Sequence, residues 1–415
     1  MIFSAQRLKN KILRDRYNSI IFEKGRGGEL YLVGGYVRDV LRGIRSKDRD
    51  YIVGKDIMCL VNEIKGVTGG TIVELRKEQM IRIALKDGIT LDFSRPLGTL
   101  KEDLSKRDFT INAVAWSPHI GIIDPHSGLK DIKQKKIRSI SEENLIADPL
   151  RMLRAYRFAA ELKGSIEKAT RKAIKIHHSK IIEISSERIT LEIFNLLNSD
   201  HSAKYLKMAL YDGLLTDILS IPYRSLERNI KEISTLEKAT INKLPSTIQA
   251  LLKKIFSQGL TYKGLLCLEL LMQIIRELKG GEGRRGDFQV KIKMSSSINK
   301  RIELSHKGIK ELKRKGDDLK NRLFDIFLIS KDAAIDILII TGRLELLKDY
   351  KRFKKIWKWG LLSSEEIISI TEVKVGPRLG RIIIELKKAQ FEGRVRSKRE
   401  AIKFVSNLNP YKTHK

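Results

Sequence analysis

The stretch "LYLVGGYVRDVLRGIRSKDRD", residues 30–50, decides the fold of the first part of the chain. A short apolar run ends at Gly34 and Gly35, an amphipathic segment follows, and Asp48 and Asp50 then stand with one residue between them. Branched apolar residues that end at glycines are typical of a β-strand, and the segment after them has helical spacing. We therefore predict a strand, a tight glycine turn, a helix and a second strand.

The first 140 residues continue this mixture of short strand-like and helical segments. Branched apolar residues bounded by turn residues predict strands at 48–54, 80–88 and 89–95. Helical spacing predicts a helix at 56–66. We therefore expect a small α/β head.

From about residue 141 the pattern changes. Apolar residues recur at helical spacing in 149–162, 188–198 and 203–215. Helical patterns continue to the end of the sequence, with breaks near 281–300 and 371–378. The expected fold class is α+β: a small α/β head with a mixed sheet, followed by a long, basic, all-helical body.

The charge of the chain points to a polyanionic partner. The 415 residues include 82 Lys and Arg against 50 Asp and Glu, a formal net charge of +32. Nucleic acid is the first candidate, an anionic membrane surface the second, and a Lys-rich surface without a partner the alternative. Because no apolar run approaches the roughly 20 residues of a membrane span, we expect no membrane partner.

Cysteine usage predicts a reducing compartment. The only cysteines, Cys59 and Cys267, are far apart, which excludes a disulfide framework and a cysteine-based zinc site. Residues 1–20 lack the apolar core of a signal peptide and contain Asp15. We therefore expect a cytoplasmic protein.

Asp48 and Asp50 have the spacing of a metal-binding pair. On a strand, residues i and i+2 share one face, so the two carboxylates repel each other unless a cation lies between them. Mg²⁺ prefers oxygen ligands and is usually held by one or two carboxylates together with substrate phosphates. The alternative is a pair of solvated acids in a turn.

The glycines before the acids can bind phosphate. Gly34 and Gly35 would let backbone N–H groups approach a phosphate at a helix N-terminus, and Arg38 on the first helical turn could reach the same phosphates. The alternative is a turn that needs glycine for backbone reasons alone. A phosphate cradle beside a metal pair suggests nucleotidyl transfer.

A third acid, Asp92, lies in the expected strand at 89–95. If this strand neighbours the one that carries the acid pair, Asp92 completes the catalytic site. If it is an edge strand, Asp92 is a surface acid. The sequence leaves both interpretations open.

Three motifs together resemble the class II tRNA nucleotidyltransferase and bacterial poly(A) polymerase family. They are "LVGGYVRDVLRGIRSKDRD" (32–50), "KRDFTINAVAW" (106–116) and "ADPLRMLRAYRFAAEL" (147–162), in the family's order. Residues 375–401 match its C-terminal element more loosely. These enzymes add nucleotides to RNA 3′ ends without a nucleic-acid template. The expected domains are a catalytic head at 1–140, a helical neck with the base-selecting helix at 141–200, a helical body at 201–330 and an RNA-binding helical tail at 331–415.

The resemblance implies a role for each motif residue. Asp48 and Asp50 would hold the catalytic metals, Mg²⁺, and Asp108 would lie near the ribose. The alternative for Arg107 and Asp108 is a local ion pair. The residues implied in nucleotide binding are Gly34, Gly35, Arg38, Arg107, Asp108, Asn112, Asp148, Arg151, Arg154 and Arg157.

Asp148 and Arg151 are expected to select the base. Residues i and i+3 share a helix face. A carboxylate accepts from an exocyclic amine and a guanidinium donates to a ring acceptor, a pairing that cytosine and adenine satisfy and that guanine and uracil do not. Asp148 also precedes Pro149, so it is a candidate helix N-cap as well. Arg154 and Arg157 continue a basic stripe toward phosphate or solvent.

Two departures from the family pattern bear on the subclass. Ala147 stands where a glutamate usually precedes the selecting aspartate. The segment between Arg95 and Arg107 is also shorter than in many members, which resembles enzymes that add only CC and leave the terminal A to a separate A-adding enzyme. We therefore favour addition of C from CTP, with addition of the whole CCA end from CTP and ATP as the other form of this activity.

Three alternatives stay open: an A-adding enzyme, a poly(A) polymerase and a non-catalytic RNA-binding protein. The segment 74–85 lacks the basic block of poly(A) polymerases, and the intact acid pair argues against a non-catalytic protein. The expected RNA partner is tRNA, recognised by the shape of its acceptor and T arms. The basic segments 310–322 and 354–360 would contact phosphates, and Trp357 and Trp359 either stack on a base or pack in a helical core.

Overall fold

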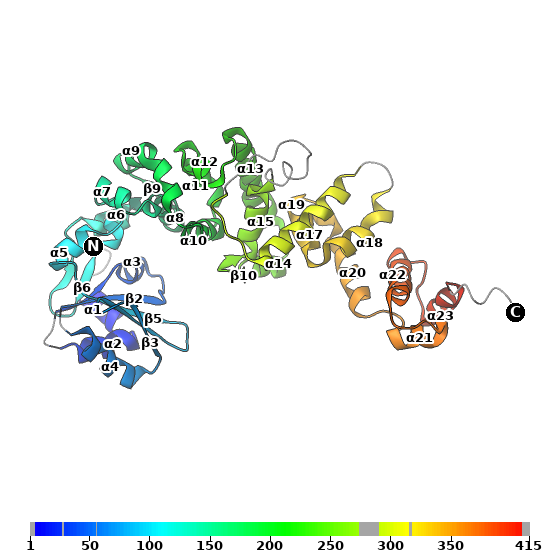
Figure 1. Ribbon diagram of the computed structural model, residues 1–415, viewed down its shortest axis with the longest axis horizontal. Coiled ribbons are helices and arrows are strands. Elements are labelled where there is room, and N and C mark those ends of the chain that lie inside the picture. Colours follow the sequence, from blue (N-terminus) through cyan, green and yellow to red (C-terminus); the bar gives the residue numbers. More distant parts are fainter. Residues whose placement is uncertain (1–4, 27–28, 55, 274–289, 315–317, 409–415) are drawn as a thin grey trace. The chain divides into compact units, whose positions relative to one another are not determined.

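A computed structural model of the chain describes residues 5–26, 29–54, 56–273, 290–314 and 318–408 (Figure 1). The chain divides into two compact units: Met1–Ile230 with Glu277–Lys293, and Lys231–Arg276 with Met294–Lys415. The finer division that the sequence suggests at 140, 200 and 330 stays a prediction. None of the helices in the described ranges is long and apolar enough to cross a membrane.

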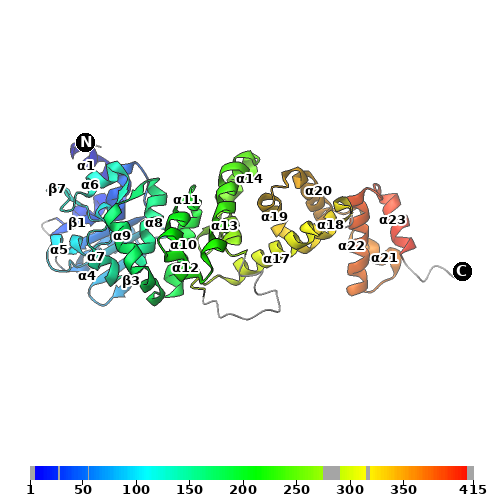
Figure 2. The ribbon, with the colours of Figure 1, turned by 90° about the horizontal axis from the view of Figure 1, so that it is seen from above.

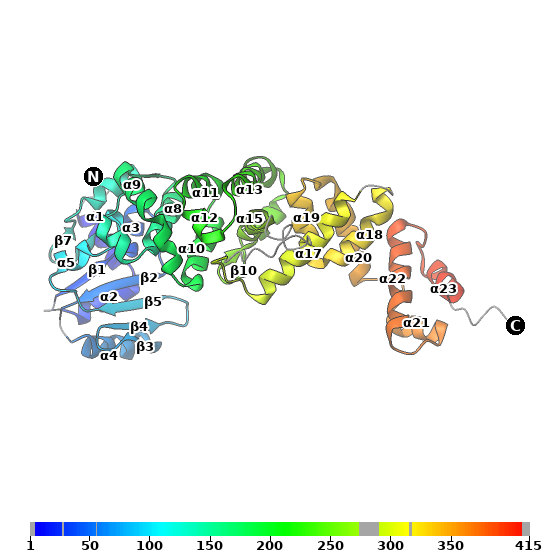
Figure 3. The ribbon, with the colours of Figure 1, turned by 45° about the horizontal axis from the view of Figure 1, so that its top comes forward.

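The first unit begins with the predicted mixed sheet. Its elements up to residue 140 are α1 (Ala5–Leu13), α2 (Arg16–Lys24), β1 (Leu30–Val33), α3 (Gly35–Arg42), β2 (Asp48–Val53), α4 (Ile57–Thr68), β3 (Thr71–Arg76), β4 (Met80–Ala84), β5 (Thr90–Ser94), α5 (Leu100–Ser105), a 3₁₀ turn (Thr110–Asn112), β6 (Ala115–Ser117), β7 (Gly121–Ile123), α6 (Gly128–Gln134) and β8 (Lys136–Ile137). Seven strands of the described residues form one sheet in the order β3-β4-β5-β2-β1-β6-β7. The strand–turn–helix–strand prediction for residues 30–50 is confirmed, as are the strands β4 and β5 (Figure 3).

The sequence did not predict β3, β6 and β7. β6 and β7 have only three residues each, and most of β3 is exposed, so none shows the alternation that marks a half-buried strand. In the sheet, β2 runs parallel to β5 and antiparallel to β1. This arrangement places β2 and β5 in the interior of the sheet.

Arg49 fixes which face of β2 carries the acids. Its buried guanidinium donates to both carboxylate oxygens of Asp15, at 3.1 and 2.5 Å, and lies over the rings of Tyr17 and Tyr36. Because side chains alternate along a strand, the residues on either side of Arg49 point to the opposite face.

A helical segment follows in the first unit. It contains α7 (Glu142–Ala147), α8 (Leu150–Leu162), β9 (Ser165–Ile166), α9 (Lys168–His177), a 3₁₀ segment (His178–Glu183), α10 (Ser186–Asn198), α11 (Ser202–Tyr211), α12 (Leu214–Leu219) and the start of α13 (Tyr223–Thr235). α8 packs against α10 and α11. The predicted stretch 203–215 is two helices, because Gly213 adopts a φ of +89° between them. β8 and β9 form a short parallel pair.

The second unit is also largely helical. It contains α14 (Ser246–Leu252), β10 (Ile255–Ser257), β11 (Leu260–Thr261), α15 (Tyr262–Leu271), α17 (Ser296–Lys313), α18 (Leu319–Ser330), α19 (Ala334–Ile340), α20 (Leu347–Lys358), α21 (Ser364–Thr371), α22 (Pro377–Glu392) and α23 (Lys398–Asn407). Rings of α18, α20 and α22 form an aromatic core. The helices α21, α22 and α23 pack together (Figure 2).

The predicted body is confirmed as largely helical, with two short strand pairs that periodicity did not reveal, β8–β9 and β10–β11. The break expected near 371–378 is present between α21 and α22, where Gly376 precedes Pro377. α17 begins at Ser296, and the part of the other expected break before residue 290 lies outside the described residues.

Candidate active site

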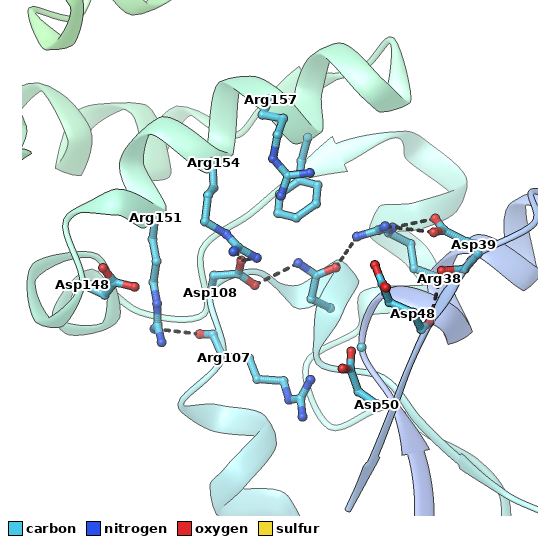
Figure 4. Close-up of a pocket in the computed structure, with 15 residues that line it drawn as sticks. Arg38, Asp39, Asp48, Asp50, Arg107, Asp108, Asp148, Arg151, Arg154 and Arg157 are labelled. Carbon is cyan, nitrogen blue, oxygen red and sulfur yellow. Dashed lines mark hydrogen bonds and ion pairs between the residues drawn. The ribbon is translucent and has the colours of Figure 1, made fainter. Parts of the chain in front are cut away.

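One cavity of about 440 Å³ in the first unit gathers almost all the predicted site residues (Figure 4). It is lined by Gly34, Gly35, Arg38, Asp39, Ser46, Asp48, Asp50, Arg107, Asp108, Asn112, Asp148, Arg151, Arg154, Arg157 and Phe158. Of the predicted residues, only Asp92 is absent from this lining. Asp48 and Asp50 lie at one end, Asp148 and Arg151 lie at the other, and Asp108 lies between them.

Asp48 and Asp50 lie on the same face of β2, as their spacing predicted. Asp48 Oδ1 accepts a hydrogen bond of 2.7 Å from the Thr90 hydroxyl. Burial raises the pKa of Asp50 to about 6; Arg107 opposes this rise, and the carboxylates of Asp92 and Asp48 add to it. Asp50 is therefore a buried carboxyl group whose main opposing charge is Arg107.

Asp92 lies directly beside Asp50 in the register of the parallel strands β2 and β5. It is buried, and Arg82 holds both of its oxygens at 2.7 Å. The alternative of an edge-strand surface acid is therefore wrong, because β5 is interior. Asp92 does not line the cavity, but its carboxylate helps to raise the pKa of the neighbouring Asp50.

The glycine turn needs glycine for two reasons. Gly34 adopts a φ of +71°, which is strained for other residues, and a Cβ there would lie 2.9 Å from Arg107 Nη1 and 3.3 Å from Asp50 Oδ2. The Gly34 N–H donates to the Val114 carbonyl at 3.2 Å, so it serves the turn. Gly35 begins α3 beside the acids.

Arg38 lines the cavity and has protein partners, and its predicted role in holding the triphosphate stays a prediction. Its guanidinium is buried and donates to Asn112 Oδ1 at 2.6 Å and to Asp39 at 3.0 and 3.2 Å. The sequence signal that we missed was the adjacent acid, Asp39. Arg38 therefore braces α3 against the turn that contains Asn112, while still lining the cavity.

Asp108 accepts three hydrogen bonds and forms an ion pair with Arg154. Its Oδ1 accepts from the Phe109 N–H at 2.8 Å and from Asn112 Nδ2 at 2.9 Å, and its Oδ2 accepts from Arg154 Nε at 2.9 Å and lies 2.8 Å from Arg154 Nη2. Although burial acts to raise the pKa of Asp108, Arg154 and these donors lower it overall. The alternative of a local Arg107–Asp108 ion pair is wrong, because Arg107 lies 3.4 Å from Asp103.

Asp148 and Arg151 line the far end of the cavity without bonding to each other. Arg151 Nη1 donates to the carbonyls of Arg107 and Asn144, at 3.3 and 3.2 Å. Asp148 accepts from Arg188 on α10, at 3.2 and 2.9 Å. The N-cap alternative is wrong, because α8 has Pro149 as its N-cap and no side-chain cap.

Three guanidinium groups surround the ring of Phe158. Those of Arg38, Arg154 and Arg157 lie 5.0, 5.2 and 3.9 Å from its centroid. Arg157 also pairs with Glu161 at 2.6 Å and with Glu192 at 2.5 Å. The predicted stripe toward solvent is therefore a packed network.

Four supporting residues escaped the sequence reasoning: Asn144, Phe158, Arg188 and Glu192. Arg188 and Glu192 are four residues apart near the start of α10, a spacing that places them on one helix face. That charged face was a readable signal, but only the packing of α10 on α8 shows that it meets the site.

Comparisons with known proteins agree with this architecture. Residues 30–138 match the family model described as "Poly A polymerase head domain", and residues 165–223 match "Probable RNA and SrmB- binding site of polymerase A". The CC-adding tRNA nucleotidyltransferases of Synechocystis sp. and Geobacter sulfurreducens are 25% and 29% identical to this chain. Each alignment covers 91% of this chain, and 93% and 91% of the relatives respectively.

A solved structure has the same fold. The Thermotoga maritima CCA-adding enzyme, complexed with tRNA, superposes with a TM-score of 0.73 at 20% identity and covers 98% of both chains. The matched segments contain the motifs at residues 32–50 and 106–116 that line the cavity. The two family models and the aligned relatives support the class II tRNA nucleotidyltransferase and bacterial poly(A) polymerase family for this chain.

Proposed function

We propose that this protein is a tRNA 3′-end nucleotidyltransferase that adds C residues from CTP. One observation carries the proposal: a single cavity has the acid pair Asp48 and Asp50 at one end, and at the other a carboxylate and a guanidinium, Asp148 and Arg151, that do not bond to each other. A nucleoside triphosphate has matching ends, its phosphates and its base.

The residues at the acid end fit a divalent cation, and we propose Mg²⁺. Asp48 and Asp50 supply hard oxygen ligands from one strand face. Burial raises the pKa of Asp50, and the nearby carboxylates of Asp92 and Asp48 add to this rise. No group of three or more His, Cys, Asp or Glu side chains in the described ranges could hold a metal ion. The triphosphate oxygens would therefore complete the coordination. When bound, the cations would activate the RNA 3′-hydroxyl and stabilise the leaving pyrophosphate.

The protein's own groups position the reactants. The RNA 3′-hydroxyl attacks the α-phosphate of the nucleotide, and pyrophosphate leaves. Arg107 lies beside Gly34 and Asp50, where its charge can neutralise phosphate oxygens. Asp108, held by Asn112 and Arg154, is placed to accept from a ribose hydroxyl. Because these groups are already braced, little reorganisation is needed on binding.

Asp148 and Arg151 would choose the base. The Asp148 carboxylate accepts from the exocyclic amine of cytosine or adenine, and Arg151 donates to the neighbouring ring acceptor. Guanine and uracil present a carbonyl instead of that amine, so a lone pair would face the carboxylate. Arg151 bonds to its carbonyl partners through Nη1, so its other guanidinium nitrogens can donate to the base. Asp148 can keep Arg188, because a carboxylate accepts more than one hydrogen bond.

Two observations favour CC addition over the whole CCA end. Two relatives that align over 91% of the chain, those of Synechocystis sp. and Geobacter sulfurreducens, are named CC-adding. The short segment after β5 contains α5, whose capping box joins Thr99 and Glu102. A short, capped segment leaves little room for a flexible loop. In the family, such a loop is associated with the change from adding C to adding A. A separate A-adding enzyme would then complete the CCA end.

Poly(A) polymerase is the second candidate, because both matching family models carry that description. We also propose a cytoplasmic location, which the free cysteines Cys59 and Cys267 favour.

Incorporation assays test the proposal. The protein is incubated with Mg²⁺, each NTP in turn, and tRNA that ends before CCA, after C or after CC. We expect C to be added until two are present. Addition of A to the CC end would refute the subclass, and long A tails on unstructured RNA would refute the tRNA assignment.

Two substitutions test the metal site. Asp48→Asn and Asp50→Asn should each lower the rate by at least about a thousandfold, since each removes a proposed metal ligand. The matched control is Asp200→Asn, an exposed acid paired with Lys163 outside the cavity. Full activity in either site variant would remove the metal hypothesis.

A further inference from the structure

The second unit contains a cavity that the proposed chemistry does not use. It has a volume of about 400 Å³ and lies between the end of α20, the start of α21 and the side of α22. It is lined by Lys358, Trp359, Gly360, Leu361, Leu362, Ser363, Ser364, Glu366, Ile367, Ile383, Leu386, Lys387 and Gln390.

Trp359 is the exposed aromatic residue at this cavity. Its side chain is 70% exposed, which excludes the core-packing alternative for this residue. Trp357 differs, because its ring stacks on Phe353 with centroids 5.8 Å apart and an interplanar angle of 18°. The amine of Lys358 lies 5.0 Å from the Trp359 centroid. A flat ring beside a cation is the arrangement that binds a base together with its phosphate.

Gln390 gives an independent sign of a ligand. Its side chain lines the cavity and the residue is 7% exposed. Its Nε2 is buried and has no hydrogen-bond partner among the described residues. A buried amide nitrogen without a partner is unfavourable, and an acceptor on a bound molecule would satisfy it.

The surroundings favour a polyanion. α20 exposes Lys351, Lys354, Lys355 and Lys358 along its length. Lys387 on α22 donates to the Trp357 carbonyl at 2.5 Å and lies 4.6 Å from the Trp357 centroid. Burial lowers the pKa of Lys387, which a nearby phosphate would reverse. A neutral or basic peptide would leave these cations unmatched, and an acidic peptide would pair with the lysines but would bring no flat base to stack on Trp359.

We propose that this cavity takes one unstacked nucleobase of the RNA substrate. The base stacks on Trp359, an acceptor on its edge receives Gln390 Nε2, and Lys358 and Lys387 contact the adjoining phosphates. The identity of the ligand rests on the proposed function, because that function makes RNA the substrate. The site is sequence-tolerant, since every base has a ring face to stack.

Fluorescence of Trp359 tests the proposal directly. In full-length Trp357→Phe protein, the other tryptophan is Trp116, which is 1% exposed. We expect tRNA and a single-stranded oligouridine to quench the remaining exposed signal. An abasic oligomer of equal length carries the same charge and should leave the signal unchanged. Equal quenching by the abasic oligomer would overturn the proposal, because charge alone would then explain binding.

Two variants test the contacts. Trp359→Ala should weaken RNA binding about tenfold and Gln390→Leu several-fold. The KM for tRNA should rise while kcat at saturating tRNA stays constant. The matched control is Tyr211→Ala, an exposed ring with the Lys175 amine 4.1 Å from its centroid but outside this cavity. Thermal unfolding of each variant checks that the fold is intact.

The two proposals fail in different ways. If the wild type binds RNA with quenching but incorporates no nucleotide, the proposed function is wrong and the base site stands. If incorporation is normal and Trp359→Ala changes neither the fluorescence response nor the KM for tRNA, the base site is wrong. Quenching by a peptide or a free nucleotide but not by RNA would also refute it.

Discussion

Arg188 Nη2 donates to both carboxylate oxygens of Asp148, at 3.2 and 2.9 Å. The two residues are forty positions apart, on α10 and just before α8. The family's usual glutamate is absent, because Ala147 stands before Asp148. Arg188 therefore supplies, from another helix, a fixed orientation for the carboxylate that we assign to base selection.

Arg188→Ala should weaken base selection. Both side chains are partly exposed, so the pair contributes at most about 1 kcal/mol to stability. Its loss lets the carboxylate rotate away from the amine of cytosine. We expect kcat/KM for CTP to fall about tenfold, or about 1.4 kcal/mol, and the preference over UTP to shrink.

Competition between CTP and UTP in single-nucleotide incorporation measures this effect. Arg188→Lys keeps the charge and should recover part of the preference. An unchanged CTP to UTP ratio in Arg188→Ala would show that Arg188 does not position Asp148.

The raised pKa of Asp50 predicts a conflict between stability and function. Its folded-state pKa is about 6, against an ordinary value of 3.8. A carboxyl group with a raised pKa stabilises the fold while protonated. Its contribution is therefore complete below about pH 4 and is lost as the pH rises through about 6. The difference corresponds to roughly 3 kcal/mol at most.

Asp50→Asn should therefore unfold at a higher temperature than the wild type at about pH 8 and at a similar temperature at about pH 4. Mg²⁺ with CTP should raise the unfolding temperature of the wild type but not of the variant, because a ligand stabilises only the state that binds it. Scanning calorimetry at both pH values is the measurement. Equal unfolding temperatures of the wild type and Asp50→Asn at about pH 8 would contradict the destabilising effect that we assign to the ionised Asp50 carboxylate.

Gly34 and Gly43 form a matched pair of positive-φ glycines at the two ends of α3. Their φ values are +71° and +78°, but a Cβ at Gly43 has nothing within 4 Å, whereas one at Gly34 meets Arg107 and Asp50. Alanine at Gly43 should cost about 1–2 kcal/mol of stability, because Gly43 has a left-handed backbone. Alanine at Gly34 should cost more, because its φ of +71° and ψ of −135° lie outside the left-handed region that other residues can adopt. Only Gly34→Ala should also displace site residues.

Chemical unfolding and CTP incorporation together check this prediction. Gly34→Ala should lose more stability than Gly43→Ala, and only Gly34→Ala should lose most of its activity. An active Gly34→Ala protein would mean that this glycine serves the turn alone.

Arg154 stabilises the buried carboxylate of Asp108. Arg154→Ala leaves that charge without its main cation and should cost about 1–3 kcal/mol at neutral pH. Because Arg154 helps to lower the pKa of Asp108, the stability that it contributes is present above the ordinary carboxyl pKa and is lost as the pH falls below it. The difference in the free energy of unfolding between the wild type and Arg154→Ala should therefore be smaller at acidic pH.

A double-mutant cycle with Asp108→Asn isolates this pair. The double variant should be more stable than Arg154→Ala alone, because the neutral amide needs no cation. Asp108→Asn should separately reduce the preference for CTP over dCTP. If the stability losses of Arg154→Ala and Asp108→Asn add up to the loss of the double variant, Arg154 and Asp108 are not coupled.

Local patterns in the sequence determined much of this protein. The apolar run that ends at Gly34 predicted a strand followed by a turn. The spacing of Asp48 and Asp50 predicted that both carboxylates lie on one strand face, because side chains alternate between the two faces of a strand. The three motifs named the family and twelve residues that line one cavity.

Tertiary structure decided what those residues contact. Arg38 donates hydrogen bonds to Asp39 and Asn112, and Arg188 donates to Asp148. These partners come from packing between segments far apart in the chain, which no local period encodes. Whether Asp92 was buried or exposed likewise depended on strand order, since only the position of β5 beside β2 makes it an interior neighbour of Asp50.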